Sequence, residues 1–312
     1  MDMLVQILLL VVGFVMLIKG ADWFVEGASA IAAKFGIPQL VIGLTIVAIG
    51  TSAPEAAVSV TAALNDNAGI TIGNVVGSNI LNVLVILGVT SVITVLAVGK
   101  STIRYEMPFM IAMTVLLLVL GLDGQVGRID GVILWVAFIV YMVYLFMLAK
   151  KGMDGAAEEE KPKDVSVIKA ILLTIIGFAL IIFGSDVTVD AATEIATMLG
   201  VDERIIGLTI VALGTSLPEL CASAVAAKKG KADIAIGNIV GSNLFNILFV
   251  VGTSALIVPV PFQKEFIIDT SVAIAAGVLL LLCSLKDKKL KRWAGIMMLA
   301  SYAGYFAFLM LK

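Results

Sequence analysis

GTSAPE, residues 50–55, recurs as GTSLPE, residues 214–219, and each copy interrupts a long apolar segment. Each places hydroxyls, a proline and a glutamate in the middle of a run that could cross a bilayer. A carboxylate at that depth costs about 2.5–3.5 kcal/mol on insertion scales, so it is rare without a function. Because proline removes a backbone donor and displaces the preceding turn, we expect each helix to break beside its glutamate.

The composition is that of an integral membrane protein. Hydrophobic residues make up 61% of the 312 residues and charged residues 14%, whereas soluble chains carry about 25% charged residues. There is no histidine, and the two cysteines, Cys221 and Cys283, lack the spacing of a metal or redox site. No basic tract suits nucleic acid, so we expect a lipid bilayer as the partner and no cofactor or obligatory protein partner.

Apolar runs of about 20 residues predict an all-α integral membrane fold with ten transmembrane helices. The expected spans are 3–21, 38–64, 70–98, 105–122, 128–149, 167–185, 203–227, 233–258, 265–285 and 291–311. The first and sixth continue into amphipathic tails, which either extend tilted helices or lie at the interface. Residues 151–166 read as a charged cytoplasmic linker between the units 1–150 and 167–312.

The distribution of basic residues predicts the orientation of the chain. With ten spans, sixteen of the 21 Lys and Arg residues fall on one side of the membrane. The other side holds four, namely Arg128, Arg204, Lys264 and Lys312. Because basic loops stay in the cytoplasm, we expect both termini outside and the cell membrane as the location.

The two halves of the chain are repeats. GLTIVAIGTSAPE at 43–55 matches GLTIVALGTSLPE at 207–219, and GNVVGSNILN at 73–82 matches GNIVGSNLFN at 237–246, both at an offset of 164 residues. The duplicated unit spans five helices, and five is odd, so the second copy is expected upside down. Inverted repeats with interrupted helices are typical of secondary transporters, whose site lies at the repeat interface.

The first motif of each repeat supplies oxygen ligands. Positions three and four apart share a helix face, so Thr51 and Ser52 are expected to project with Glu55. The same spacing groups Thr215 and Ser216 with Glu219. The proline breaks are expected to expose carbonyls, including those of Ala48 and Ala212. Carboxylate, hydroxyl and carbonyl oxygens without nitrogen or sulfur suit hard cations such as Ca²⁺ and Na⁺.

The second motif adds a row of hydroxyls and amides. Ser78 and Asn82 share a face, as do Ser242 and Asn246, and the row continues to Asn74 and Asn238. Asn79 and Asn243 point elsewhere, where they are expected to bond across helices or support the broken backbone. The alternative for all these side chains is ordinary hydrogen bonding between helices.

These paired motifs resemble the two alpha-repeats of the sodium/calcium exchanger family, in the calcium:cation antiporter superfamily, and most of all its compact prokaryotic members. The resemblance covers essentially the whole chain. It implies four central cation sites between the second, third, seventh and eighth helices, and a sliding pair formed by the first and sixth. By motif position it implies these ligands: Glu55, Glu219, Thr51, Thr215, Ser52, Ser216, Ser78, Ser242, Asn82, Asn246 and the carbonyls of Ala48 and Ala212.

Asn246 departs from part of the family. Potassium-dependent members and certain archaeal ones carry aspartate at this position. With amides at Asn82 and Asn246, the pocket offers two carboxylates, which balance one Ca²⁺ or two Na⁺. This composition weakens the case for potassium dependence.

The sequence therefore predicts a secondary active antiporter, not an enzyme, that exchanges Na⁺ for Ca²⁺ by alternating access. A Ca²⁺/H⁺ antiporter of the same fold is the alternative, since buried carboxylates can carry protons. Either version predicts weaker Ca²⁺ binding as the pH falls through the pKa values of the two glutamates. Two other classes, an intramembrane hydrolase with two acids and a passive channel, fit the duplicated polar rows and broken helices less well.

Overall fold

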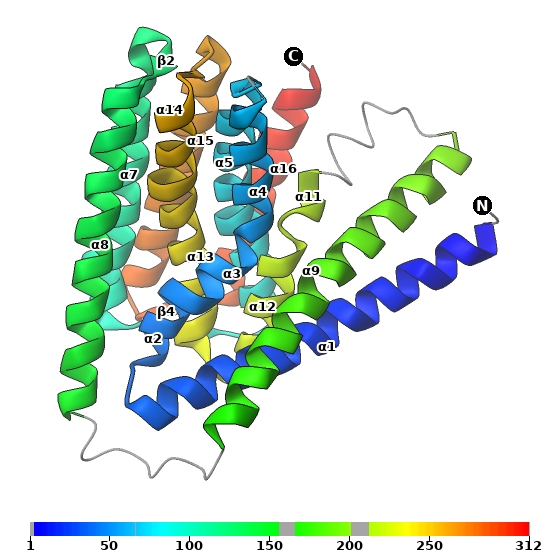
Figure 1. Cartoon of the computed structure of the whole chain (residues 1–312), viewed down its shortest axis with the longest axis vertical. Coiled ribbons are helices and arrows are strands. Elements are labelled where there is room, and N and C mark those ends of the chain that lie inside the picture. The colour runs from blue at the N-terminus through cyan, green and yellow to red at the C-terminus, as the bar shows by residue number, and fades with distance from the viewer. Residues whose placement is uncertain (1–2, 66, 156–165, 201–211, 312) are drawn as a thin grey trace.

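The computed structural model describes residues 3–65, 67–155, 166–200 and 212–311. Its elements are almost all helices, most of them running along the long axis of the molecule (Figure 1). The elements of the first half are α1 (Met3–Phe35), α2 (Gln39–Ile42), η1 (Gly43–Val47), α3 (Ala48–Thr51), α4 (Ala53–Leu64), α5 (Gly69–Leu81), η2 (Asn82–Leu87), α6 (Gly88–Ile93), β1 (Leu96–Ala97), η3 (Thr102–Glu106), α7 (Met107–Leu120), η4 (Gly121–Asp123), β2 (Gln125–Val126) and α8 (Arg128–Gly155).

The second half repeats this order in the residues that are described, without counterparts of η3 and η4. Its elements are α9 (Val167–Met198), α11 (Ala212–Gly214), α12 (Leu217–Lys228), α13 (Ala232–Phe245), η6 (Asn246–Val251), α14 (Gly252–Ile257), β3 (Val260–Pro261), α15 (Lys264–Leu285), β4 (Lys289–Leu290) and α16 (Arg292–Leu311). Four of the short segments, η1, η2, η3 and η6, are π-helical turns inside longer helices.

Eight helices within the described ranges are long and apolar enough to cross a membrane, or nine if the bent pair of 39–51 and 53–64 counts as one span. They agree with the predicted spans to within a few residues, apart from the first and sixth. Those two continue as unbroken helices to Phe35 and Met198, so their amphipathic tails extend the helices. The predicted span 203–227 begins among residues 201–211, which lie outside the described residues.

Helices α1 and α9 lie side by side, antiparallel and inclined to the other helices (Figure 1). Glycines allow this close approach. A Cβ added at Gly20 would lie 2.8 Å from the carbonyl oxygen of Gly177, and one at Gly184 would lie 3.0 Å from that of Gly13. Real side chains rarely tolerate such distances, so the crossing depends on small residues, as is common between membrane helices.

Two short strand pairs tie the halves together at the two ends of the molecule. β1 pairs antiparallel with β4, with Leu96 opposite Leu290, and β2 pairs antiparallel with β3, with Val126 opposite Val260. A shift of 164 residues converts one pair into the other. Because β2 and its equivalent β4 lie at opposite ends (Figure 1), the second copy of the fold is inverted relative to the first.

The centre of the molecule is formed by α5 and α13, each continued by its π-helical turn. Every described side chain of α13 from Ile234 to Phe245 is buried, including the polar residues Asn238, Ser242 and Asn243. Burying so many amides and hydroxyls is costly unless they are hydrogen-bonded. This polar core between apolar helices is therefore the natural place to search for a site.

Candidate cation site

The helix containing the first motif breaks where proline predicts. α3 ends at Thr51, Ser52 takes the non-helical angles φ −84° and ψ 8°, and α4 begins at Ala53. The two parts are bent by 50°. Ser216 has nearly the same angles, φ −91° and ψ 2°, immediately before α12. Each break therefore places a glutamate in the first turn of a new helix, where the partial positive charge of the helix favours an anion.

Glu55 and Glu219 are completely buried and close enough to interact electrostatically. Oε1 of Glu55 accepts a hydrogen bond from the Ser78 hydroxyl at 3.2 Å. Oε1 of Glu219 accepts one from the Ser52 hydroxyl at 3.0 Å. Neither glutamate has a basic partner in an ion pair within the described residues. The two carboxylates are thus held in place by neutral hydroxyl groups.

The hydroxyls of each break reach into the opposite repeat. Thr51 donates to Oδ1 of Asn238 at 3.0 Å, and Ser216 lies 3.3 Å from the Ser78 hydroxyl. Thr215 interacts in turn with the Glu55 carboxylate. Helical spacing predicts that Ser52 lies beside Glu55 of its own repeat. Its hydroxyl is instead hydrogen-bonded to Glu219 of the other repeat.

Amide side chains form the middle of the cluster. Asn79 Nδ2 donates to the Asn243 carbonyl at 3.2 Å, and Asn243 Nδ2 donates to the Asn79 carbonyl at the same distance. Their side-chain oxygens accept from Asn246 and Asn82, at 3.2 Å and 2.9 Å respectively. The four asparagines therefore form one symmetric network across the repeat interface. The expectation that Asn79 and Asn243 bond across helices is confirmed.

Four buried oxygen atoms of this cluster accept no hydrogen bond. They are Oε2 of Glu55, Oε2 of Glu219, Oδ1 of Asn82 and Oδ1 of Asn246. Each repeat contributes one carboxylate oxygen and one amide oxygen. Buried polar atoms are normally satisfied, so four equivalent exceptions together need a physical reason. Hard cations coordinated by oxygen would satisfy atoms of this kind and offset the charge of the carboxylates.

The remaining predicted residues lie beside this cluster. Ser242 donates to the Ala48 carbonyl at 3.4 Å, and Thr51 donates to the same carbonyl at 3.4 Å. The Ala48 carbonyl faces these hydroxyls but also accepts the helical hydrogen bond from the Ser52 N–H at 3.0 Å, so the break does not release it as expected. Ala212 is the first residue of α11, at the edge of the described part.

Two serines extend the site beyond the sequence prediction. Asn74 Nδ2 donates to the Ser59 hydroxyl at 2.9 Å and to the Glu55 carbonyl at 3.2 Å. Asn238 Nδ2 makes the same two contacts with Ser223 and Glu219, at 3.0 Å and 3.4 Å. Ser59 and Ser223 each follow a motif glutamate by four residues and differ by 164. This spacing is the feature of the sequence from which the two serines could have been predicted as part of the site.

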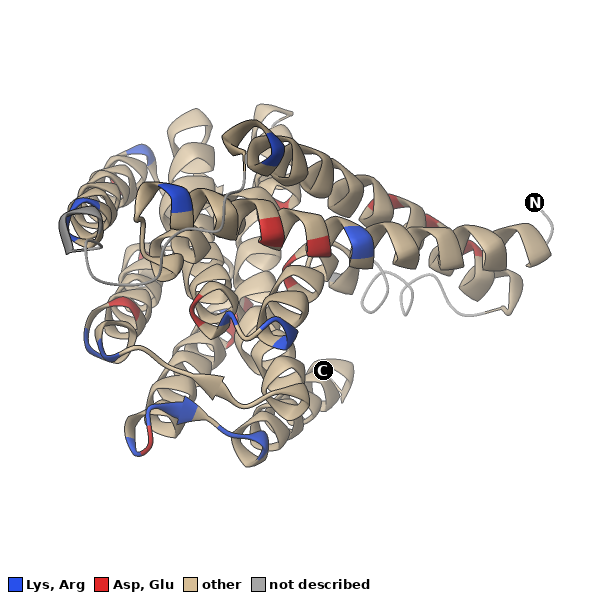
Figure 2. Ribbon diagram, turned by 90° about the horizontal axis from the view of Figure 1, so that it is seen from below, with Lys and Arg blue, Asp and Glu red and all other residues tan. Residues whose placement is uncertain are grey.

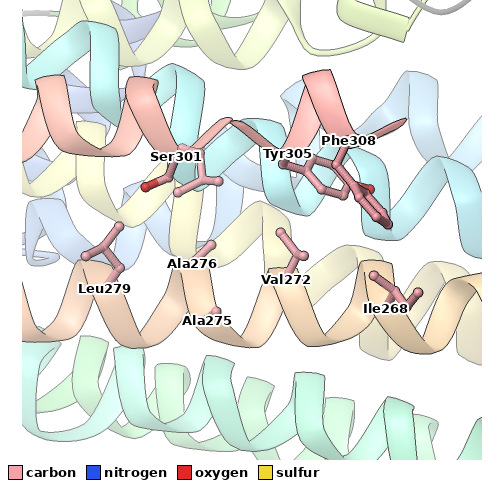
Figure 3. Close-up of a pocket in the computed structure, with 9 residues that line it drawn as sticks. Ile268, Val272, Ala275, Ala276, Leu279, Ser301, Tyr305 and Phe308 are labelled. Atoms are coloured by element: carbon pink, nitrogen blue, oxygen red, sulfur yellow. The ribbon is translucent and has the colours of Figure 1, made fainter. Parts of the chain in front are cut away.

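A crevice of about 370 Å³ between α15 and α16 is separate from this cluster (Figure 3). Its walls are mostly apolar, including Val272, Leu279 and Phe308. The Tyr305 hydroxyl at one end is already bonded to Asp269 at 2.8 Å. Without an available charged group, this crevice does not compete with the buried cluster as a cation site.

The model of the family described as "Sodium/calcium exchanger protein" matches residues 5–147 and again residues 169–311. The chain belongs to the sodium/calcium exchanger family. Both halves match the same model, as expected of a repeat, and the family resemblance of the two motifs is confirmed. The family consists of membrane transporters, not enzymes.

The following relatives and solved structure of this family cover nearly the whole chain. The sodium/calcium exchanger MaX1 of Methanosarcina acetivorans is 32% identical over 98% of each chain. The inner membrane protein YrbG of Escherichia coli is 36% identical over 98% of this chain and 97% of its own. The structure of the sodium-calcium exchanger NCX_Mj soaked without Na⁺ and Ca²⁺ matches 99% of this chain with a TM-score of 0.85 and 34% identity.

Proposed function

We propose that this member of the sodium/calcium exchanger family is a secondary active antiporter that exchanges Na⁺ for Ca²⁺ by alternating access. The observation that carries the proposal is the set of four unpartnered oxygens from Glu55, Glu219, Asn82 and Asn246. They face a core without histidine or cysteine ligands, which suits hard cations. The relatives named as sodium/calcium exchangers support the same ions.

Competition for the same carboxylates would couple the two ions. Ca²⁺ and Na⁺ both need Glu55 and Glu219, so the site holds one load or the other. An empty site would leave two buried carboxylates without a counter-charge, which is expensive in a low dielectric. The site would therefore switch its opening from one side of the membrane to the other only with an ion bound. The gradient of each ion would then drive transport of the other ion in the opposite direction.

We assign the ligands by motif position and hydrogen bonding. Glu55 and Glu219 are the shared ligands of both ions. Further oxygens come from Thr51, Thr215, Ser52, Ser216, Ser78, Ser242, Asn82, Asn246 and the carbonyls of Ala48 and Ala212. The hydroxyls that now bond to the carboxylates would turn toward a bound ion.

The membrane arrangement follows from the same proposal. We infer ten transmembrane helices, with 203–227 as the seventh, and both termini outside the cell. The repeats are 1–150 and 167–312, joined by a cytoplasmic linker at 151–166, in the plasma membrane. The gathering of Lys and Arg in loops at the end seen in Figure 2 supports this orientation.

Transport in sealed vesicles tests the proposal. Purified protein is reconstituted with Na⁺ inside, and Ca²⁺ uptake is measured on dilution into Na⁺-free or Na⁺-matched medium. An outward Na⁺ gradient should drive uptake, and uptake indifferent to Na⁺ would overturn the proposal. Uptake driven by an imposed pH gradient without Na⁺ would instead identify the Ca²⁺/H⁺ version. K⁺ gradients and Glu265→Gln, which changes an exposed glutamate, serve as controls.

A further inference from the structure

A third buried carboxylate lies outside the candidate cation site. Among the described residues, the buried acidic side chains are Glu55, Glu219 and Glu106. Glu106 ends the π-helical turn η3 and is 1% exposed. It faces α8, whereas the other two glutamates lie on α4 and α12. Its function is not explained by the exchange site.

Glu106 and two nearby hydroxyl residues each have an oxygen atom that lacks a hydrogen-bond partner. Its Oε1 accepts a hydrogen bond from the Tyr144 hydroxyl, but its Oε2 has no partner. The hydroxyl of Tyr141, one turn before Tyr144 on α8 and interacting electrostatically with Glu106, also has no partner. The same is true of Thr102, four residues before Glu106. Tyr141 and Thr102 are 4% and 1% exposed.

The cluster is connected to one surface of the protein by polar groups. Asp233, at the exposed start of α13, interacts electrostatically with Glu106. Asp233 and Thr102 both lie close to Gly99: a Cβ there would be 3.8 Å from Asp233 Oδ1 and 3.2 Å from Thr102 Oγ1. Arg104 does not compensate Glu106, because its guanidinium lies over the exposed ring of Tyr105, 5.7 Å from the centroid.

This cluster is duplicated only in part, because Tyr141 has an equivalent in Tyr305, which bonds to the Asp269 carboxylate. The residues 164 positions after Glu106, Tyr144 and Thr102 are Thr270, Phe308 and Phe266. A site through which ions pass in both directions uses matching groups from both repeats, as Glu55 and Glu219 do. The position equivalent to Glu106 carries no carboxylate, and Asp269, one residue before it, is already bonded to Tyr305, so the arrangement around Glu106, close to the β1–β4 end, differs from its counterpart. A cation held there would remain on one side of the membrane.

We propose that Glu106, Tyr141, Tyr144 and Thr102 form a second, non-transporting site for a monovalent hard cation of the Na⁺ class. One buried carboxylate balances one such charge, and the tyrosine and threonine hydroxyls supply neutral oxygen ligands. Asp233 at the surface would attract the cation toward the cluster. The unpartnered oxygens of Glu106, Tyr141 and Thr102 would be ligands of this cation.

The test separates this site from the exchange site by removing the latter. Full-length Glu55→Gln/Glu219→Gln protein is purified, and its Tm is measured against NaCl, with choline chloride at the same ionic strength as the reference. We expect a saturable rise in Tm with NaCl. Adding Glu106→Gln should abolish the rise, while adding the exposed change Glu265→Gln should preserve it. Adding Tyr141→Phe should weaken the apparent Na⁺ affinity roughly tenfold, the effect of one lost ligand contact.

A second measurement does not depend on the double variant. Radioactive Na⁺ binding to otherwise wild-type protein with saturating Ca²⁺ should show one ion fewer per molecule after Glu106→Gln. Failure of NaCl to raise Tm, or an equal rise after Glu106→Gln, would overturn the proposal. Stabilisation by acid alone, without Na⁺, would also overturn it by identifying a proton as the occupant.

Discussion

The Ser52 hydroxyl donates to Oε1 of Glu219 at 3.0 Å, although the two residues belong to opposite repeats. Ser52 occupies the cap position of α4, yet its side chain does not cap that helix. The hydrogen bond to the other half takes precedence because Glu219 is completely buried and needs a donor. The candidate cation site is therefore assembled from both halves at the level of single hydrogen bonds.

Replacing this hydroxyl should weaken ion binding. We expect Ser52→Ala to lower apparent Ca²⁺ affinity roughly tenfold, since one oxygen ligand and one donor to Glu219 are lost. Isothermal titration of Ca²⁺ in detergent measures the change. Ser271→Ala, which removes an exposed hydroxyl bonded to its own helix, should leave the affinity unchanged. Equal affinities for Ser52→Ala and wild type would contradict the assignment.

The glutamates should be indispensable for binding. Glu55→Gln and Glu219→Gln each remove one of two negative charges that balance Ca²⁺, so each should abolish measurable Ca²⁺ binding and Na⁺-driven uptake. Both variants should still fold, because glutamine keeps the size of the side chain and an oxygen acceptor. Size-exclusion chromatography with the vesicle assay checks both expectations, and retained uptake in either variant would refute the shared-ligand role.

The asparagine network should contribute to stability. Asn243→Ala removes the donor to the Asn79 carbonyl and the acceptor of the Asn82 amide, and it leaves both partners buried. Each such loss costs about 1–3 kcal/mol, so Tm should fall markedly even without ions. A double-mutant cycle with Asn79→Ala should show coupling of about 0.5–3 kcal/mol, and strict additivity would count against the network.

Asn246→Asp should change the balance of charges in the site. The amide donor to Asn79 Oδ1 is lost, and a third carboxylate is added to the core. We expect a lower Tm in ion-free buffer and a larger increase in Tm on adding cations, because more buried charge then depends on a bound ion. Thermal unfolding with and without Ca²⁺ or Na⁺ measures both effects, and an unchanged ion dependence would be evidence against Asn246 facing the ions.

The surface ion pairs that join α1 to the turn before α13 should respond to salt. Lys229 Nζ lies 2.7 Å from Asp22 and 3.7 Å from Glu26, and all three side chains are partly exposed. Such pairs contribute about 0–1 kcal/mol and are screened at high ionic strength. Lys229→Gln should therefore alter exchange rates at low salt and have little effect at high salt. Lys291→Gln, which breaks a pair within one segment, is the control.

The control pair also affects the titration of its acid: the hydrogen bond and the charge of Lys291 lower the pKa of the Asp287 carboxyl.

Much of this structure could be predicted from local sequence signals. Pro54 and Pro218 locate the two helix breaks, and the offset of 164 residues relates the halves. The partner of Ser52 could not be predicted from helical spacing, because spacing describes one repeat and the bond joins two. The π-helical turns that begin at Asn82 and Asn246 also leave no clear pattern in the sequence, although such turns often mark functional sites.

The two strand pairs restrict how this protein can move. β1–β4 and β2–β3 each join one half of the sequence to the other, at opposite ends of the molecule. Neither half can rotate as a rigid body without breaking both ribbons. We therefore do not expect the two sequence repeats to move as rigid bodies relative to each other. Helices α1 and α9, one from each half, lie outside both ribbons and pack against each other, so under the proposed alternating access we expect these two helices to be the moving pair.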